Sequence, residues 1–279
     1  MSKPFFSVII PTFNRLELLK KSIDSVLKQS FESYELIIID DGSSDDTLEY
    51  LESQALRYLC VSDKDQPQGV SRARNIGINK TQAEWICFLD SDDIWFPSKL
   101  EEQFKFIKKF PHFKINYTQE RWIRRGVRVN QRIKHQKSGG DLFNRSLEMC
   151  LIGPSTVCIR RDLLERYNGF REDFIVCEDF DLWLKVTARE EVGFIETELI
   201  EKYDGHEDQL SKRFVAMDYY RVKSIKWVLD NLELSEHKQE RAREVLIKKA
   251  KILLNGYKKH DNLDNYDEIS YILDSIVGV

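Results

Sequence analysis

The sequence contains no long apolar run, and this absence bears first on membranes. None of its hydrophobic stretches approaches the roughly 20 residues that a membrane-spanning helix requires. The apolar stretch near the N-terminus is short, is broken by Pro11 and lacks a small-residue cleavage site, so we do not expect a signal peptide. The sequence therefore predicts a protein without a transmembrane segment, in the cytoplasm or at the inner face of the membrane.

A basic excess and a cysteine pattern are also missing. The chain has 279 residues, and its 43 lysines and arginines face 47 aspartates and glutamates, for a net charge of −4. This balance argues against a dedicated nucleic-acid-binding protein. The five cysteines have neither zinc-site spacing nor a disulfide framework, and they indicate reduced core residues of a cytoplasmic protein: Cys60, Cys87, Cys150, Cys158 and Cys177.

What the chain does have is a regular alternation of strands and helices over its first hundred residues. Apolar segments with little polar alternation predict four buried strands, at residues 5–10, 35–40, 57–62 and 84–89. Amphipathic helical segments separate them, which indicates an α/β fold with a mostly parallel sheet covered by helices on both faces. Ligands bind at the carboxyl ends of such strands, where three polar segments fall: Pro11 to Asn14, Asp40 to Asp41 and Asp90 to Asp93.

The pattern changes in the second half of the chain. The segments there predict a strand with a hairpin turning at Gly126, another strand and a helix, at residues 115–133, 155–160 and 180–188. From about residue 208 onward, three helical stretches follow without strand signals.

Three carboxylates crowd into four positions of FLDSDDIWF, residues 88–96. Asp90, Asp92 and Asp93 directly follow the fourth predicted strand. A hard divalent cation, Mg²⁺ or Mn²⁺, would suit them, because it binds through one or two carboxylates together with phosphate oxygens. Such an ion would neutralise a diphosphate, above all one that is a leaving group. The alternative is a solvated turn that caps the next helix, and the cluster alone leaves both interpretations open.

Two other acidic segments lie at the ends of predicted elements. In DDGSSDDT, Asp41 would project into the same crevice, where its carboxylate can accept a hydrogen bond from a uracil-like imide or a ribose hydroxyl. CEDFDLWLK places three acids at a helix start: Glu178, Asp179 and Asp181. The helix dipole explains one such acid. A carboxylate that Trp183 partly desolvates would have a raised pKa and would accept a proton better, so this segment suggests a general base.

These segments resemble family 2 glycosyltransferases with the GT-A fold. SVIIPTFNR, IIIDDGSSDDT, GVSRARNIGI, WICFLDSDDIW and CEDFDLWLK occur in the order seen in that family and together cover roughly residues 5–189. The resemblance implies a Rossmann-like sheet and the transfer of a sugar from a nucleotide diphosphate donor, which we take to be a UDP-sugar, to a hydroxyl. It also implies inversion at the anomeric carbon and the use of Mn²⁺ or Mg²⁺.

The resemblance further implies which residues bind the donor. Nine residues would contact the nucleotide sugar: Pro11, Thr12, Phe13, Asn14, Asp41, Arg74, Asp90, Ser91 and Asp93. The first four would form the loop against the nucleobase, and Asp41 would read the base. Arg74 would reach the donor phosphates or Asp90, or would instead form a salt bridge on a solvated helix.

A metal ion is implied by the same comparison. Asp90 and Asp92 match the two acids of the D-x-D motif, of which the first tends to face the ribose and the second the metal. Asp93 follows the motif and could share either task. His206, in YDGHEDQLSKRF, would add a metal ligand, as a histidine does in some GT-A enzymes; a solvated loop histidine is the alternative.

The implied chemistry is a single displacement. Asp179 matches the general base, with Glu178 beside it, and would accept the acceptor's proton as its oxygen attacks the anomeric carbon. A metal on Asp92 would stabilise the charge that grows on the diphosphate. No enzyme nucleophile is needed, which agrees with the lack of a convincing Ser/His/Asp or Cys/His set.

We expect a catalytic domain over residues 1–207, with a nucleotide-binding half (1–110) and an acceptor-binding half (111–207), and a C-terminal helical region over 208–279. The basic segment 121–137 is compatible with an acidic glycan, a lipid diphosphate or peripheral membrane contact, but its alternation is typical of a solvent-facing hairpin, which we favour. An apolar stripe in the C-terminal region would pack on the domain or on a second subunit: Val245, Leu246, Ile252 and Leu253.

The leading hypothesis is a metal-dependent glycosyltransferase that moves a hexose or N-acetylhexosamine to a glycan or glycolipid in bacterial surface polysaccharide assembly. Transfer to polyprenyl phosphate is an alternative, although that class usually brings membrane helices or a short catalytic domain. A non-catalytic nucleotide-sugar-binding module is another, although Asp92 and Asp179 are both present. No G-x-G-x-x-G follows the first strand, which disfavours a dehydrogenase.

Overall fold

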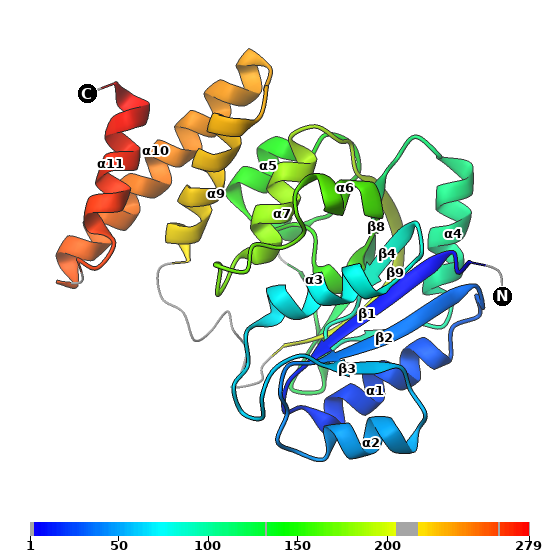
Figure 1. Ribbon diagram of the computed structural model, residues 1–279. Coiled ribbons are helices and arrows are strands. Elements are labelled where there is room, and N and C mark those ends of the chain that lie inside the picture. Colours follow the sequence, from blue (N-terminus) through cyan, green and yellow to red (C-terminus); the bar gives the residue numbers. More distant parts are fainter. Residues whose placement is uncertain (1–2, 132, 205–216, 262, 279) are drawn as a thin grey trace.

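The computed structural model describes residues 3–131, 133–204, 217–261 and 263–278 (Figure 1). Within these ranges nine strands form one sheet: β1 (Phe6–Thr12), β2 (Tyr34–Asp40), β3 (Tyr58–Cys60), β4 (Trp85–Phe88), β5 (Ile94–Trp95), β6 (Ile115–Arg124), β7 (Val127–Val129), β8 (Val157–Arg160) and β9 (Gly193–Asp204). The α-helices are α1 (Leu16–Leu27), α2 (Thr47–Ser53), α3 (Val70–Lys80), α4 (Lys99–Lys109), α5 (Phe143–Glu148), α6 (Arg161–Arg166), α7 (Glu178–Thr187), α9 (Asp218–Asn231), α10 (Glu236–Lys259) and α11 (Tyr266–Val277). Two short 3₁₀ turns are η1 (Ile133–His135) and η2 (Pro154–Thr156).

The first half of the sheet is parallel, as the sequence predicts. Strands β3, β2, β1 and β4 are neighbours in that order, and all three pairs run parallel. Every residue of β1 is buried, because helices cover both faces of the sheet. Thr12 pairs with Asp40 in the adjacent strand, so the polar residues after β1 and β2 meet at one edge.

The second half of the sheet is mixed; the prediction of a parallel sheet came from the first hundred residues and is confirmed there. β4 and β6 both pair antiparallel with β8, and β6 pairs parallel with β9. The strand β9 was not predicted, because glutamates interrupt its apolar pattern at Glu196, Glu198 and Glu201. Its pairing with β6 also shifts register on either side of Gln119, which a simple period-two pattern does not reveal.

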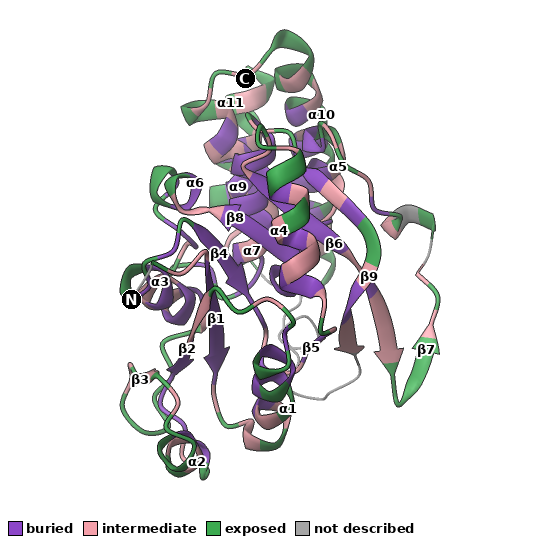
Figure 2. Cartoon of the chain, turned by 90° about the vertical axis from the view of Figure 1, so that its right-hand side faces the viewer, coloured by how far each residue is buried: buried purple, intermediate pink, exposed green. Residues whose placement is uncertain are grey.

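The basic segment forms the hairpin that the sequence predicts. β6 and β7 pair antiparallel, and Gly126 lies at the turn with a φ of 76°. Arg121 and Arg128 both reach Glu198 of β9, at 3.1 and 2.6 Å. These pairs, together with the exposed hairpin end in Figure 2, agree with the favoured interpretation of a solvent-facing hairpin.

Two apolar layers cover the faces of the sheet. On one face, Ile9 and Ile39 pack with residues of α3, α6 and α7, including Trp183. On the opposite face, Val8 and Ile10 pack with residues of α1, α2 and α4. The prediction of a sheet with helices on both sides is therefore confirmed (Figures 1 and 2).

The three predicted C-terminal helices are present as α9, α10 and α11, and they lie against α5 and α7 (Figure 1). Phe180 and Leu184 of α7 belong to one core with Val222 of α9. Three residues of the predicted apolar stripe are buried: Val245, Leu246 and Leu253. The fourth, Ile252, is 57% exposed and therefore lies outside the stripe. No helix in the described ranges is long and apolar enough to cross a bilayer.

Helix α3 lies unusually close to the sheet because residue 77 is glycine. A Cβ at Gly77 would stand 2.5 Å from Cγ2 of Ile9 and 3.3 Å from Cγ1 of Ile39. Such a distance is a steric clash, so only glycine permits this spacing. The spacing matters for the site described below, because it fixes the helix that contains Arg74.

We predict opposite effects for two glycine-to-alanine substitutions in helices. Gly77→Ala should lower the free energy of unfolding by about 1–3 kcal/mol, because the added methyl overpacks the core against Ile9. Gly256→Ala, in α10, should leave stability unchanged or raise it by up to about 1 kcal/mol, since no atom lies within 4 Å of its added Cβ. Urea unfolding measures both, and equal effects would contradict the packing argument.

Candidate active site

The predicted site residues follow strand ends at one edge of the sheet. Asp41 follows β2, Asp90 follows β4, and Glu178 begins α7. The chain enters α7 through Cys177, which has a left-handed backbone with a φ of 63°. A non-glycine residue in this conformation is strained, and such strain persists only where the surroundings hold it in place.

Arg74 connects the acids that come from the two halves of the chain. Its Nη2 atom lies 2.7 Å from Oδ1 of Asp90, and its Nη1 atom lies 2.8 Å from Oε1 of Glu178. The guanidinium also lies over the ring of Phe170, 5.0 Å from its centroid. Burial alone would lower the pKa of Arg74, but the charges of Asp90 and Glu178 raise it. Arg74 is 3% exposed, so the alternative of a salt bridge on a solvated helix is excluded.

The three acids of the D-x-D segment have different surroundings. Asp93 is buried, and both of its carboxylate oxygens accept hydrogen bonds, from Ser155 Oγ at 2.6 Å and from the amide of Tyr203 at 3.2 Å. Burial raises the pKa of Asp93 well above its usual value. Asp92 is partly exposed and lies 3.2 Å from Nη1 of Arg15, and Asp90 is the most exposed of the three side chains. Asp92 and Asp90 therefore remain accessible to solvent, whereas Asp93 anchors β9 and η2.

The predicted base has a neighbour that the sequence did not suggest. Oδ2 of Asp179 accepts a hydrogen bond from the thiol of Cys150 at 3.4 Å, and Oδ1 accepts one from the amide of Phe180 at 2.6 Å. Glu178 is buried and bound to Arg74; burial raises its pKa, and so does the charge of Asp179. The two acids of this pair therefore differ: Glu178 is held by Arg74, and Asp179 is the more accessible one.

The loop predicted to face the nucleobase is tied to the segment after β2. Oδ1 of Asn14 accepts hydrogen bonds from the amides of Ser44 and Asp45, at 2.7 and 3.3 Å. Asn14 has a positive φ of 49°, which asparagine tolerates well. Pro11 and Thr12 are buried within β1, whereas Phe13 and Asn14 follow the strand and are more accessible.

Asp41 holds a second loop in place. Its Oδ1 atom accepts hydrogen bonds from the hydroxyl of Ser62 and from the amide of Gln68, at 3.0 Å, and its Oδ2 atom accepts one from the amide of Gly69 at 2.8 Å. Gly69 precedes α3, so this carboxylate fixes both the loop and the start of that helix.

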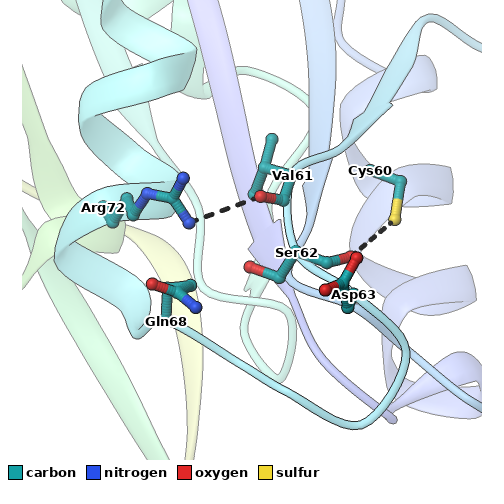
Figure 3. A pocket seen from close by; sticks show the side chains of 6 residues that line it. All are labelled: Cys60, Val61, Ser62, Asp63, Gln68 and Arg72. Carbon is teal, nitrogen blue, oxygen red and sulfur yellow. Dashed lines mark hydrogen bonds between the residues drawn. The ribbon is translucent and has the colours of Figure 1, made fainter.

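An open pocket of about 400 Å³ lies next to the loop that Asp41 holds, and Figure 3 shows the side chains that line it. Its lining was not predicted and runs from the last residue of β3 into the first turn of α3: Cys60, Val61, Ser62, Asp63, Gln68 and Arg72. Nη1 of Arg72 donates a hydrogen bond to the carbonyl of Val61 at 3.4 Å (Figure 3). Sequence position could have suggested this pocket, because the segment follows the third strand at the same edge of the sheet.

Three charged residues of the second half of the chain were also not predicted: Glu120, Lys137 and Lys202. Nζ of Lys137 lies 3.1 Å from Oε2 of Glu120, and both side chains are buried. Lys202 lies on β9. Burial alone would raise the pKa of Glu120, but the positive charges of Lys137 and Lys202 lower it. Because β9 was not recognised in the sequence, nothing there placed Lys202 near the acids.

The described residues fit a metal site with two protein carboxylates. Asp90 and Asp92 offer carboxylates at the crevice, and Mg²⁺ or Mn²⁺ takes one or two of these with phosphate oxygens of a substrate. No group of three or more His, Cys, Asp or Glu side chains in the described ranges is arranged to hold a metal ion without other ligands. His206, the third predicted ligand, lies outside the described residues.

The comparisons with known proteins identify the class. The family model described as "Glycosyl transferase family 2" matches residues 7–167. The chain therefore belongs to this family, as its motifs predicted, and the predicted enzyme class of glycosyltransferase is confirmed.

Particular relatives add detail. An uncharacterized glycosyltransferase of Rickettsia bellii is 35% identical over 69% of this chain, and the match spans only 28% of that protein's length. The chain thus matches less than a third of the length of this relative. The Escherichia coli protein WfgD, a UDP-Glc:alpha-D-GlcNAc-diphosphoundecaprenol beta-1,3-glucosyltransferase, is 31% identical over 79% of this chain and 83% of its own.

Solved structures confirm the GT-A fold. Staphylococcus aureus TarS, crystallised with UDP-GlcNAc, has a TM-score of 0.70 and 20% identity, over 95% of this chain and 90% of that one. The mannosyltransferase PcManGT of Pyrobaculum calidifontis, crystallised with GDP-Man and Mn²⁺, has a TM-score of 0.63 and 15% identity, over 99% and 85%.

We predict that Arg74→Met lowers the free energy of unfolding by about 3–5 kcal/mol, because it leaves Glu178 as a buried charge without a counterion and removes the ion pair of the partly exposed Asp90. Arg74→Lys should recover only part of that loss, since one ammonium cannot reproduce the two-pronged guanidinium geometry. As a control, Arg166→Met breaks an exposed pair with Glu190 and should cost about 1 kcal/mol or less. Urea unfolding distinguishes these cases. An Arg74→Met protein as stable as the control would show that the contacts of Arg74 with Asp90 and Glu178 do not stabilise the fold.

Proposed function

We propose that the protein transfers a sugar from a UDP-sugar to a hydroxyl of a glycan or glycolipid, with inversion and with a divalent metal ion. The observation that carries this proposal is the double contact of Arg74. It brings Asp90, at the predicted D-x-D motif, and Glu178, next to the predicted base Asp179, to within 2.7 and 2.8 Å of one guanidinium. Donor-binding and proton-accepting groups are thus neighbours, as a single displacement requires.

The uridine would occupy the pocket beside Asp41. The pocket offers amide, guanidinium and carbonyl groups from Gln68, Arg72 and Val61, which suit the polar edge of a base. Both carboxylate oxygens of Asp41 accept hydrogen bonds from the loop before α3. We therefore propose that Asp41 contributes to base binding indirectly, because it holds this loop in place. The UDP and UDP-GlcNAc complexes of TarS support the choice of uridine.

A divalent ion would be held by Asp92 and Asp90, with Ser91 between them. When bound, it would neutralise charge on the departing diphosphate. Asp93 is left out of this assignment, because both of its carboxylate oxygens already accept hydrogen bonds from the protein. The Mn²⁺ complex of PcManGT, which has a similar fold, supports the proposal that a metal ion binds here.

Asp179 would take the proton of the acceptor hydroxyl. Glu178 is bound to Arg74, which leaves Asp179 as the acid at the start of α7 that can reach a substrate. The Cys150 thiol donates to one of its oxygens and so orients the carboxylate. As the acceptor oxygen attacks the anomeric carbon, the bond to the diphosphate breaks on the opposite face, which inverts the configuration.

The acceptor would be a sugar hydroxyl on a lipid-linked saccharide. WfgD, which is similar over most of both chains, acts on a diphosphoundecaprenol-linked GlcNAc according to its name. A second E. coli protein with the same named activity, WfaP, is 27% identical over 66% of this chain. Such an acceptor would bring the protein to the inner face of the membrane. A homo-oligomer stays a prediction.

The function is tested by a panel of nucleotide sugars with Mn²⁺ and a lipid-linked GlcNAc acceptor. We expect turnover with a UDP-sugar and an inverted anomeric product by NMR. Asp179→Asn should keep donor affinity and lower kcat about 100-fold or more, since general-base catalysis contributes about 10²–10⁴-fold. Cys177→Ala, beside it, should keep most activity. If Asp179→Asn turned over at the parental rate, the base would lie elsewhere.

We further predict that Asp92 and Asp93 respond differently to the same change. Asp92→Asn should raise the Mn²⁺ concentration needed for half-maximal turnover by about 10-fold or more, because it removes a charged ligand. Asp93→Asn should leave that concentration near the parental value and should change the melting temperature instead, because Asp93 bonds to Ser155 and Tyr203. The reverse pattern would assign the metal to Asp93.

A further inference from the structure

Lys202 lies on β9 directly before Tyr203, whose backbone amide donates a hydrogen bond to Asp93 at 3.2 Å. Lys202 pairs with Trp122 in the register of β6 and β9, two residues along from Glu120. The Nζ atom of Lys202 and Oε2 of Glu120 lie 3.5 and 3.6 Å from the point where a Cβ at Gly153 would stand. Both charged groups therefore lie against the loop that leads into η2.

The charges of carboxylates from three parts of the fold act on this ammonium. Glu120 comes from β6, Asp90 and Asp93 from the segment after β4, and Asp179 from α7. Burial by itself would lower the pKa of Lys202, but the charges of these four acids raise it. The charge of Lys202 in turn lowers the pKa of Asp93, against the effect of burial. Lys202 is thus a cation that these acids stabilise.

This ammonium has neighbours but no direct partner. Among the described residues, no side chain or carbonyl forms a hydrogen bond with Nζ of Lys202, and no carboxylate lies within ion-pair distance of it. Three buried cations differ, because Arg74, Lys137 and Lys185 each contact a carboxylate, and buried Lys99 bonds to Gln103. Lys202 is partly buried, and without a direct contact to the protein its three N–H donors stay available to an anionic ligand.

We propose that Lys202 binds the diphosphate of the donor and stabilises the charge that the diphosphate gains as the sugar leaves. This inference rests on the proposed function. Of the reacting groups, only the diphosphate is an anion, whereas the acceptor hydroxyl is neutral. A lysine ammonium suits phosphate because it carries three N–H donors and a full point charge.

The step balances without any other group. The acceptor oxygen forms a bond to the anomeric carbon and releases its proton to Asp179. The bond between that carbon and the diphosphate oxygen breaks, and its electron pair stays on the diphosphate. Lys202 keeps its proton and binds the more negative product, so it stabilises the leaving group more strongly than the intact donor.

The test compares UDP with uridine, because the two differ only in the diphosphate. Lys202→Gln should weaken UDP binding by about 10-fold or more in calorimetry, since hydrogen bonds to charged groups are worth at least that factor. Uridine binding, measured by NMR titration, should stay unchanged. Lys202→Arg should recover most of the UDP affinity. Lys114→Gln, which removes a lysine paired with Glu190 away from the site, should leave both ligands at parental affinity.

The measurements separate this inference from the function on which it rests. If the parent protein bound no uridine nucleotide, the donor assignment would fail; the comparison would then be repeated with GDP and guanosine, and Lys202→Gln should still weaken only the diphosphate. Equal losses of UDP and uridine affinity, or a lowered melting temperature with parental UDP affinity, would show that Lys202 only balances the acids. Parental UDP affinity with a raised KM for the acceptor would place it on the acceptor side, which also overturns the proposal.

Discussion

The buried contact between Arg74 and two carboxylates is the constraint on which the site depends. Asp90 follows the last strand of the parallel half of the sheet, and Glu178 starts a helix that lies between β8 and β9 of the mixed half, 88 residues further along the chain. One planar guanidinium with two parallel donors satisfies both at 2.7 and 2.8 Å, which an ammonium cannot do in the same geometry. The close approach of α3 at Gly77 sets where this guanidinium lies. Packing of a helix on a sheet therefore decides the spacing of these two carboxylates.

The start of α7 is held from two sides. Leu182, Trp183 and Val186 pack into the core beneath the sheet, whereas Phe180 and Leu184 pack with the C-terminal helices. This double packing can maintain the left-handed backbone at Cys177, which would otherwise relax. The C-terminal helices thus contribute to the site without supplying an acid to it, because they fix the helix at whose first turn Asp179 lies.

Much of the fold and part of the site could be predicted from the sequence, because the signals are local. Buried parallel strands give continuous apolar runs, and the acids of the D-x-D segment directly follow such a run. The mixed half could not be predicted equally well, since β9 contains glutamates that pair with arginines of β6 rather than with solvent. Lys202 and Glu120 were missed for the same reason. The distinction between Asp92 and Asp93 depends on Ser155 and Tyr203, which no local pattern reveals.

The free site balances its acids with its own cations, and this has a consequence for binding. Oδ2 of Asp92 lies 3.2 Å from Arg15, and Oδ1 of Asp90 lies 2.7 Å from Arg74. A metal ion that enters must use the other oxygens or displace Arg15, and two carboxylates alone bind Mg²⁺ or Mn²⁺ weakly. In the proposed function, the diphosphate would supply the missing oxygens and offer Arg15 a new partner. Metal and donor would therefore bind more tightly together than either would alone, because each would satisfy charges that the other leaves unpaired.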